Sequence, residues 1–198
     1  IVTQSLYTIY IVGLNMILKI FTEDAVTVLG IYYKIQSFFF IPLLGFQQVL
    51  LPLFSYHYGA GDRHRNREIL KCSMIFSVII MAVATGIFFL FPEKLVHIFS
   101  KGSAIVAIGK TAFPVISISF VFAGLTIVIT SYLQGIAHIK ASLFIIVLRQ
   151  IVLLVPLAWL LHFIGLNAVW WTFPVTEIIA SVTGILIIWI LHKEDSAL

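Results

Sequence analysis

Apolar residues fill six long stretches of the chain, and short polar breaks separate them. The stretches lie near residues 2–21, 25–56, 69–91, 104–132, 140–163 and 168–191. A bilayer core about 30 Å thick requires about 20 apolar residues per helix, and each stretch reaches that length. The repeated alternation over about ten residues that marks membrane β-strands is not found. The pattern therefore predicts an all-α membrane protein of six transmembrane helices, whose short connections make neighbouring helices antiparallel.

The composition supports a lipid environment. Apolar residues make up 61% of the chain, charged residues 10%, and the mean hydropathy is +1.12. A soluble domain is roughly half apolar and about a quarter charged, so the lipid bilayer is the expected surrounding partner. The net charge of +4 does not predict a nucleic-acid partner, because the cations lie mainly in short loops between apolar stretches. Such a distribution indicates membrane topology.

Basic residues mark one side of the predicted bundle. Arg63, Arg65 and Arg67 crowd the second connection, Lys140 follows the fourth, and Lys193 lies near the end of the chain. Because Lys and Arg are enriched in cytoplasmic loops, these regions are predicted to be cytoplasmic. The first, third and fifth connections then face outward.

Prolines interrupt several of the predicted helices. Pro42 and Pro52 lie in the second stretch, and Pro114, Pro156 and Pro174 lie in the last three. A proline inside a helix removes a hydrogen bond and clashes with the preceding turn. Each of these helices is therefore expected to bend.

Three ionisable residues fall well inside apolar stretches. Lys34, Arg149 and Glu177 each lie about nine residues from a helix start, or roughly 13 Å deep. Charges at this depth are costly and usually face the bundle interior or a cavity. Lys34 and Glu177 enter from the outer side at matched depth, so they are expected to pair, either as a structural contact or in substrate or proton movement. Arg149 enters from the inner side and is expected to snorkel to the cytoplasmic surface, although it could also reach the same layer.

Uncharged polar residues add to the predicted interior. They are Gln4, Asn15, Gln36, Gln47, Gln48 and Gln150. Polar groups are costly to leave unpaired in hydrocarbon, and hydrogen bonds between helices would satisfy them. Asn15 and Gln36 join Lys34, Arg149 and Glu177 as candidates for a substrate or ion pathway.

Enzymatic chemistry is not indicated. The six histidines are dispersed without metal-ligand spacing. The sequence has no Walker-type loop, no G-x-S-x-G elbow and no paired-cysteine motif. We expect no enzyme, no catalytic residue and no metal site.

Several segments, in order along the chain, carry a family resemblance. Residues 30–37 (GIYYKIQS) and 56–60 (YHYGA) resemble the eighth helix of MATE transporters, the multidrug and toxic compound extrusion family. Residues 134–140 (QGIAHIK) and 148–151 (LRQI) are similar to that family's tenth-to-eleventh connection and eleventh helix. Residues 174–177 (PVTE) are similar to the start of its twelfth helix.

The resemblance implies a twelve-helix transporter of two six-helix lobes with a cavity between them. Residues 1–198 would be the C-terminal lobe, and the N-terminal lobe of the same protein, absent from this sequence, would be its partner. Such proteins are multi-pass proteins of the cell membrane. They export amphipathic, often cationic drugs and other xenobiotics by alternating access, in antiport against H⁺ or Na⁺, with no other cofactor.

Glu177 has a special place in this comparison. One branch of the family binds its coupling cation through acidic residues in the seventh and tenth helices, but residues 2–21 and 104–132 contain no Asp or Glu here. Either Glu177 serves, or the coupling site lies in the other half. A lipid-linked saccharide flippase of the same superfamily, and a channel or non-transporting membrane domain, remain the alternative functions.

The topology is open to a direct test. In a Cys72→Ser background, Arg65→Cys should resist an impermeant thiol reagent in intact cells, because the second connection is predicted to be cytoplasmic. Lys101→Cys, in the third connection, should react. Ready labelling at position 65 would overturn the predicted orientation.

Overall fold

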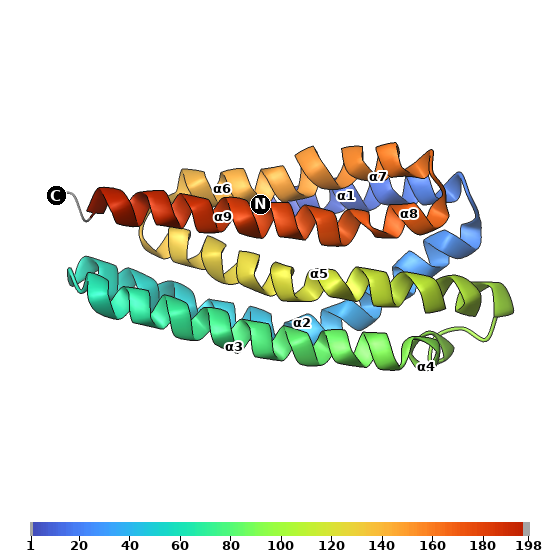
Figure 1. Ribbon diagram of the computed structural model, residues 1–198, viewed down its shortest axis with the longest axis horizontal. Helices are drawn as coiled ribbons and strands as arrows, with labels where there is room; N and C mark the ends of the chain where they lie inside the picture. The colour runs from blue at the N-terminus through green and yellow to red at the C-terminus, as the bar shows by residue number, and fades with distance from the viewer. Residues whose placement is uncertain (1, 196–198) are drawn as a thin grey trace.

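The computed structural model describes the backbone of residues 2–195 and the side chains of residues 8–193. The chain forms an elongated bundle of antiparallel helices, and no strand occurs among the described residues (Figure 1). The elements are α1 (Val2–Lys19), α2 (Glu23–Gly59), α3 (Arg63–Leu90), α4 (Pro92–His97), α5 (Ser103–Gly135), α6 (Ile139–Val147), η1 (Leu148–Leu153), α7 (Leu154–His162), α8 (Leu166–Trp170) and α9 (Thr172–Asp195). The predicted all-α membrane fold is confirmed.

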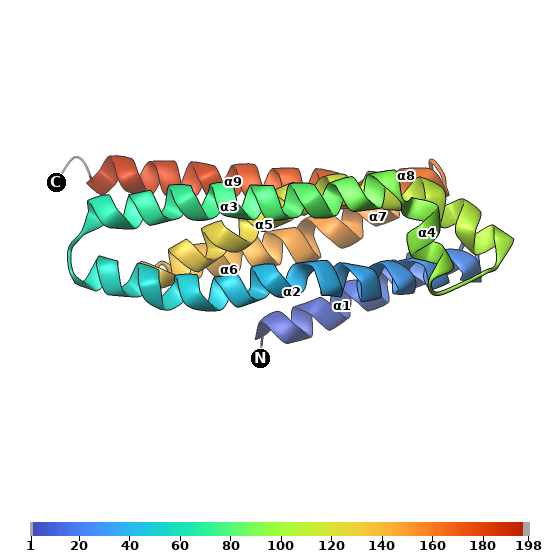
Figure 2. The same ribbon diagram turned by 90° about the horizontal axis from the view of Figure 1, so that it is seen from below.

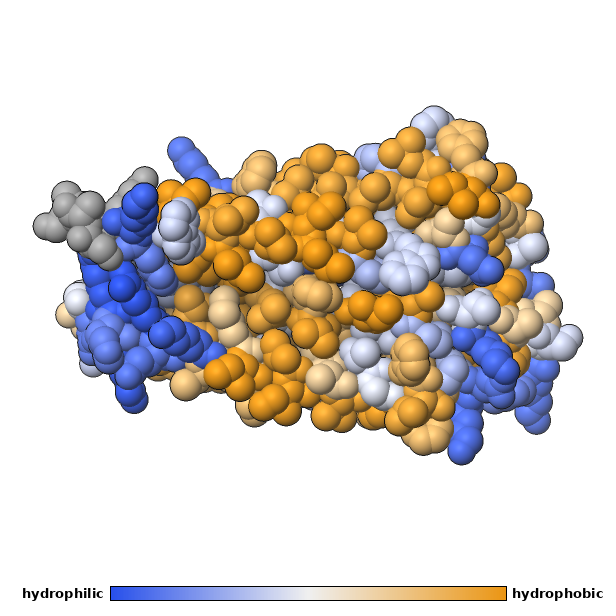
Figure 3. Space-filling model, viewed as in Figure 1, coloured by the Kyte–Doolittle hydropathy of each residue, from blue (hydrophilic) through white to orange (hydrophobic). Residues whose placement is uncertain are grey.

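The surface matches a membrane setting. Within the described residues, five helical segments are long and apolar enough to cross a bilayer, and α1 contributes a shorter apolar helix over Thr8–Lys19. Hydrophobic side chains cover the middle of the bundle on the face shown in Figure 3, and hydrophilic ones gather at its two ends. The chain is a multi-pass membrane protein.

Helix boundaries follow local capping signals. Asp62 accepts a hydrogen bond from the Arg65 amide at 2.9 Å, so α3 begins at Arg63, six residues before the expected start at residue 69. Thr22 caps α2 in the same way through the Ala25 amide at 3.1 Å. These polar caps extend the helices beyond their apolar stretches, because they satisfy amides at the helix start.

The prolines act differently from one another. The long helix α2 stays continuous through Pro42 and Pro52 but changes direction along its length (Figure 1). The predicted disruption of the last helix by Pro174 is found in the preceding turn. The chain breaks at Trp171 between α8 and α9, and Pro174 falls in the first turn of α9, where its missing N–H is not needed.

The helix α5 forms the centre of the bundle and packs against α2, α3 and α9. Its glycines allow this close approach. A Cβ at Gly124 would lie 2.5 Å from the Ser77 hydroxyl of α3, and a Cβ at Gly135 would lie 2.5 Å from the Phe54 Cβ of α2. Small residues at helix contacts let backbones come close, which is how membrane helices gain packing energy.

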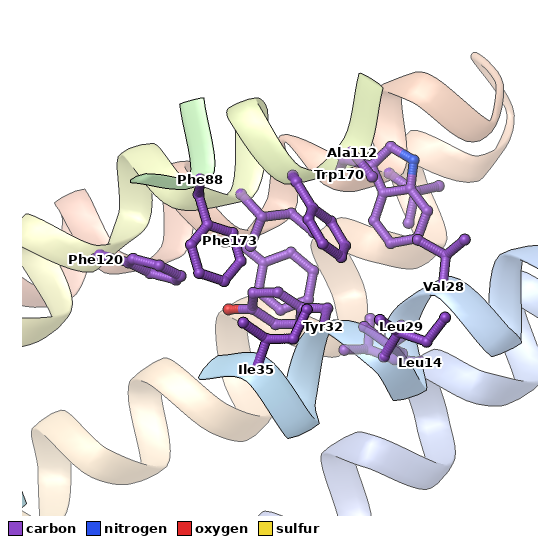
Figure 4. Close-up of a cluster of buried hydrophobic side chains, with 14 of the residues drawn as sticks. Leu14, Val28, Leu29, Tyr32, Ile35, Phe88, Ala112, Phe120, Trp170 and Phe173 are labelled. Carbon is purple, nitrogen blue, oxygen red and sulfur yellow. The ribbon is translucent and has the colours of Figure 1, made fainter. Parts of the chain in front are cut away.

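An aromatic cluster joins four helices of the bundle (Figure 4). Tyr32 of α2 stacks on Phe120 of α5 with ring centroids 6.2 Å apart. Phe88 of α3 meets Phe120 edge to face at 4.9 Å, and Phe173 of α9 meets Tyr32 at 5.6 Å. Such pairs each add about 0.5–1.5 kcal/mol beyond their burial. The cluster fixes α9 against α2, and Glu177 follows one helical turn after Phe173.

The glycine contacts predict a clear difference in stability. Gly135→Ala should destabilise the protein by about 1–3 kcal/mol. The added Cβ of the alanine would meet the Cβ of Phe54 and backbone atoms of Leu51 and Ser55, which cannot rotate away. Gly86→Ala is the control, since no atom lies within 4 Å of that site. It should be neutral or stabilising by up to about 1 kcal/mol. Thermal unfolding in detergent measures both, and equal effects would contradict the packing assignment.

Candidate functional site

A buried ion pair lies inside the bundle. Nε of Arg149 is 3.0 Å from Oε1 of Glu177. Glu177 is 8% exposed, and the Arg149 side chain is 25% exposed. The two residues come from η1 and α9, so the ion pair joins these two helices.

The helix that carries Arg149 is widened at this point. Residues Leu148–Leu153 form a π-helical turn between α6 and α7. Pro156 lies three residues after this turn. In a regular α-helix its ring would clash with the carbonyl group of Val152, four residues before it. The wider turn relieves that clash and brings the consecutive residues Arg149 and Gln150 to the same cavities. Such π-turns occur often at functional sites.

A small polar cavity of about 30 Å³ lies beside the ion pair. It is lined by Tyr10, Tyr32, Tyr33, Gln36, Ser119, Ala123, Arg149, Gln150, Leu154, Phe173 and Glu177. Oε2 of Glu177 and Oε1 of Gln150 are buried and make no hydrogen bond within the described part of the chain. A polar space of this size can hold a water molecule, which would satisfy such oxygens.

A second, wider cavity of about 400 Å³ adjoins the first. Its lining comprises Tyr10, Gln36, Ser37, Phe40, Ile41, Leu44, Gln47, Thr126, Ile127, Thr130, Ile146, Arg149 and Gln150. Tyr10, Gln36, Arg149 and Gln150 line both spaces. The Arg149–Glu177 pair therefore lies where the narrow polar cavity adjoins the wide cavity, which is lined by both apolar and polar side chains.

The expected pairing of Lys34 with Glu177 is wrong. Lys34 is exposed, and its ammonium group lies 5.9 Å from the centroid of the ring of Phe99, which follows α4. Among the described ion pairs, the partner of Glu177 is Arg149. Matched depth does not fix the direction in which a side chain leaves its helix. Here α2 turns Tyr32 inward and Lys34 outward.

Of the two alternatives for Arg149, snorkelling is wrong and reach to the layer of Glu177 is found, because its guanidinium group pairs with Glu177 inside the bundle. Gln36 lines both cavities, as a pathway residue would. Asn15 is half-buried on α1 and is absent from the described lining of either cavity. Of the five candidates, three come together: Arg149, Glu177 and Gln36.

Sequence reasoning missed the tyrosines and the hydroxyl groups of the site. Tyr10 and Tyr33 line the narrow cavity, although aromatic residues in such stretches are ordinarily interfacial. On α5, Ser119, Thr126 and Thr130 face the two cavities, each donating its hydroxyl proton to a backbone carbonyl of α5. Their spacing of seven and four residues is a helical periodicity that could have identified this polar face.

The ion pair predicts strong energetic coupling. Arg149→Met should destabilise the protein by about 3–5 kcal/mol, because it leaves the buried Glu177 carboxylate uncompensated, and Glu177→Gln should cost less, because the Arg149 side chain that it leaves unpaired is 25% exposed. The double variant should lose much less stability than the two single variants lose together. Lys34→Met combined with Glu177→Gln is the matched control and should be additive within about 0.5 kcal/mol. Thermal unfolding in detergent gives these values, and additivity of the first pair would exclude the contact.

Comparison with known proteins relates this geometry to a family. The MatE family model matches residues 1–160. Similar proteins include the multidrug export protein MepA of Staphylococcus saprophyticus, 25% identical over 181 residues that cover 91% of this chain and 40% of that protein. MepA of Staphylococcus aureus strain NCTC 8325 is 22% identical over the same shares. The chain thus spans about two fifths of the length of these relatives.

Solved structures share the fold. An outward-facing multidrug resistance MATE family transporter of the MOP superfamily matches with a TM-score of 0.88 at 20% identity, covering 93% of this chain and 42% of that one. The MATE multidrug transporter DinF-BH, solved with a bound ligand, matches with a TM-score of 0.81 at 27% identity over 95% of this chain and 43% of that one. With the family model matching most of its length, the chain belongs to the MatE family.

Proposed function

We propose that this chain forms one lobe of a secondary antiporter that exports amphipathic, often cationic drugs. Family membership supports the proposal, as do relatives named multidrug export proteins and a similar multidrug transporter solved with a bound ligand. The chain spans about two fifths of the length of these proteins, as one lobe of a two-lobed transporter would. The N-terminal lobe would be its partner, and the substrate would occupy the space between the two lobes.

The Arg149–Glu177 pair is the observation that supports a coupling site in this lobe. Glu177 is the one carboxylate well inside an apolar stretch, and its second oxygen faces the narrow cavity without a protein donor in the described structure. A proton that reaches this oxygen through water neutralises Glu177 and releases Arg149 from its partner. The freed guanidinium group then has the polar groups of the wide cavity, Gln36 among them, as new partners.

The surroundings of Glu177 favour H⁺ over Na⁺ as the coupling ion. A sodium ion at Oε2 would lie within a few ångströms of the Arg149 guanidinium group, and two like charges at such distances repel strongly in a low-dielectric interior. A proton bonds covalently to the carboxylate oxygen, so no separate cation remains beside the guanidinium group. The exchange of one proton for one substrate cation is then an exchange of like charges.

The wide cavity supplies a wall suited to drug-like molecules. Apolar side chains, including Phe40, Ile41 and Leu44, alternate with neutral polar groups such as Gln36 and Gln47. Ligand sites usually combine mostly apolar walls with a few polar groups that fix orientation. Arg149 links this wall to Glu177, so substrate binding and protonation share one residue.

Export driven by a proton gradient tests the proposal. Glu177→Gln in the assembled transporter, this chain with its partner lobe, should reduce gradient-driven export at least tenfold and leave substrate binding measurable. Glu93→Gln is the control: Glu93 pairs with Lys110 at 2.6 Å on the exposed outer end, where the ammonium group lowers the pKa of this carboxyl. Unchanged export in Glu177→Gln, with a normal dependence on the gradient, would place coupling in the other lobe.

A further inference from the structure

A groove between α2 and α3 opens at the end of the bundle opposite α4, away from the ion pair. It encloses about 870 Å³. From α2 it is lined by Phe46, Leu50 and Leu53, and from α3 by Arg65, Glu68, Ile69, Lys71, Cys72, Ser73 and Phe76. Figure 2 shows α2 and α3 joined by a short turn at this end. We propose that the groove binds one anionic phospholipid of the cytoplasmic leaflet.

The depth of the groove matches one leaflet. Arg65 and Phe76 lie eleven residues apart on α3, which corresponds to roughly 16 Å along the helix. Half of a bilayer core is about 15 Å thick. The rings of Phe46 and Phe76, with centroids 4.9 Å apart, lie at the deep end, and buried Leu50 lies along its length. An acyl chain of one leaflet therefore fits between the rim and this aromatic pair.

The rim of the groove carries positive charge. Of the charged side chains that line the groove, Arg65 and Lys71 are basic and Glu68 is acidic. Glu68 is already bound to Arg65 at 3.0 Å, a pair exposed to solvent on both sides. The rim as a whole is thus cationic and complements the phosphate of an anionic lipid, which the cytoplasmic leaflet supplies.

Lys71 makes the strongest case for a phosphate. It lies six residues beyond Arg65 along α3, roughly 9 Å further toward the membrane centre. None of the ion pairs within the described residues involves Lys71. A cation at this depth lowers its energy by reaching up to an anionic headgroup, while its methylene stem lines the groove. A lipid phosphate beside Lys71 supplies its anionic partner, and Arg65, which already pairs with Glu68, has further N–H groups for the same phosphate.

Lipid retention by the purified transporter, with its partner lobe, tests the proposal. Native mass spectrometry should show preferential retention of phosphatidylglycerol over phosphatidylcholine with the same acyl chains. Arg65→Gln and Lys71→Gln should each reduce that preference about fivefold, since a basic residue near an anionic surface is worth about 1 kcal/mol. Lys140→Gln and Lys193→Gln, made separately, each remove the same charge at the same end but outside the groove. If these controls lose the preference for phosphatidylglycerol to the same extent, general surface charge explains it, and the groove is not the binding site.

Two tryptophan variants, one inside the groove and one outside it, test the apolar wall of the groove. Leu53→Trp fills the groove and should reduce retention of both lipids. Leu51→Trp, on an equally exposed neighbouring position outside the groove, should not. Equal retention in the two variants would show that no acyl chain lies in the groove.

Cys72 reports occupancy directly, because it is exposed and lines the groove. Added phosphatidylglycerol should slow its alkylation by N-ethylmaleimide, phosphatidylcholine should slow it less, and inorganic phosphate should have no effect. Protection by inorganic phosphate alone would indicate a simple anion site. A Cys72 that is unreactive in lipid-free transporter would show that the partner lobe covers the groove. Either result contradicts the proposal, which requires the membrane fold but not drug export.

Discussion

A charge inside a hydrocarbon layer must find a partner within the protein, and the interior of this bundle is organised by that requirement. Arg149 and Glu177 meet at 3.0 Å, and neither could stay in its position without the other or a change of protonation. Their contact joins η1 to α9 at the level where the narrow cavity meets the wide one. The remaining polar groups, Gln36, Gln150 and the hydroxyls of α5, line the two cavities beside this pair.

The backbone is shaped around the same point. Pro156 forces a widened turn at Leu148–Leu153, and that turn brings Arg149 and its neighbour Gln150 to the cavities together. On the opposite side α5 supplies a narrow polar face, while its glycines admit α2 and α3 at close distance. The aromatic cluster of Tyr32, Phe88, Phe120 and Phe173 then holds α9 in place, so that Glu177 is presented by a rigid framework. Precise positioning of a buried charge needs such packing, because a misplaced charge in hydrocarbon has no water to compensate it.

The sequence predicts the helices well and their facing directions poorly. Length and hydropathy suffice for the fold class, since each crossing must be apolar for about 20 residues. Polar caps such as Asp62 extend α3 beyond its apolar stretch, which hydropathy alone does not detect. The sequence indicates the depth of Lys34, Arg149 and Glu177 in the membrane, but it does not indicate which residue pairs with Glu177. Pairing depends on rotation about each helix axis, and a π-turn shifts that rotation for every residue beyond it. Tyr10 and Tyr33 escaped notice because their rings resemble ordinary membrane aromatics until the cavity is seen.

The exposed face of α2 is more polar than a lipid-facing helix surface. Lys34, Ser37 and Gln48 are exposed along it, and Ser37 donates its proton to the Tyr33 carbonyl of its own helix. Polar groups that face lipid at mid-membrane are costly, so this face is suited to water or to protein. The wide cavity also reaches α2 on this side, through Ser37, Ile41 and Gln47. A partner lobe placed against α2 would cover the polar surface and complete the cavity at once. The same contact that makes the lobe stable in the bilayer would therefore also create the binding space, which ties folding of the two-lobed transporter to its proposed function.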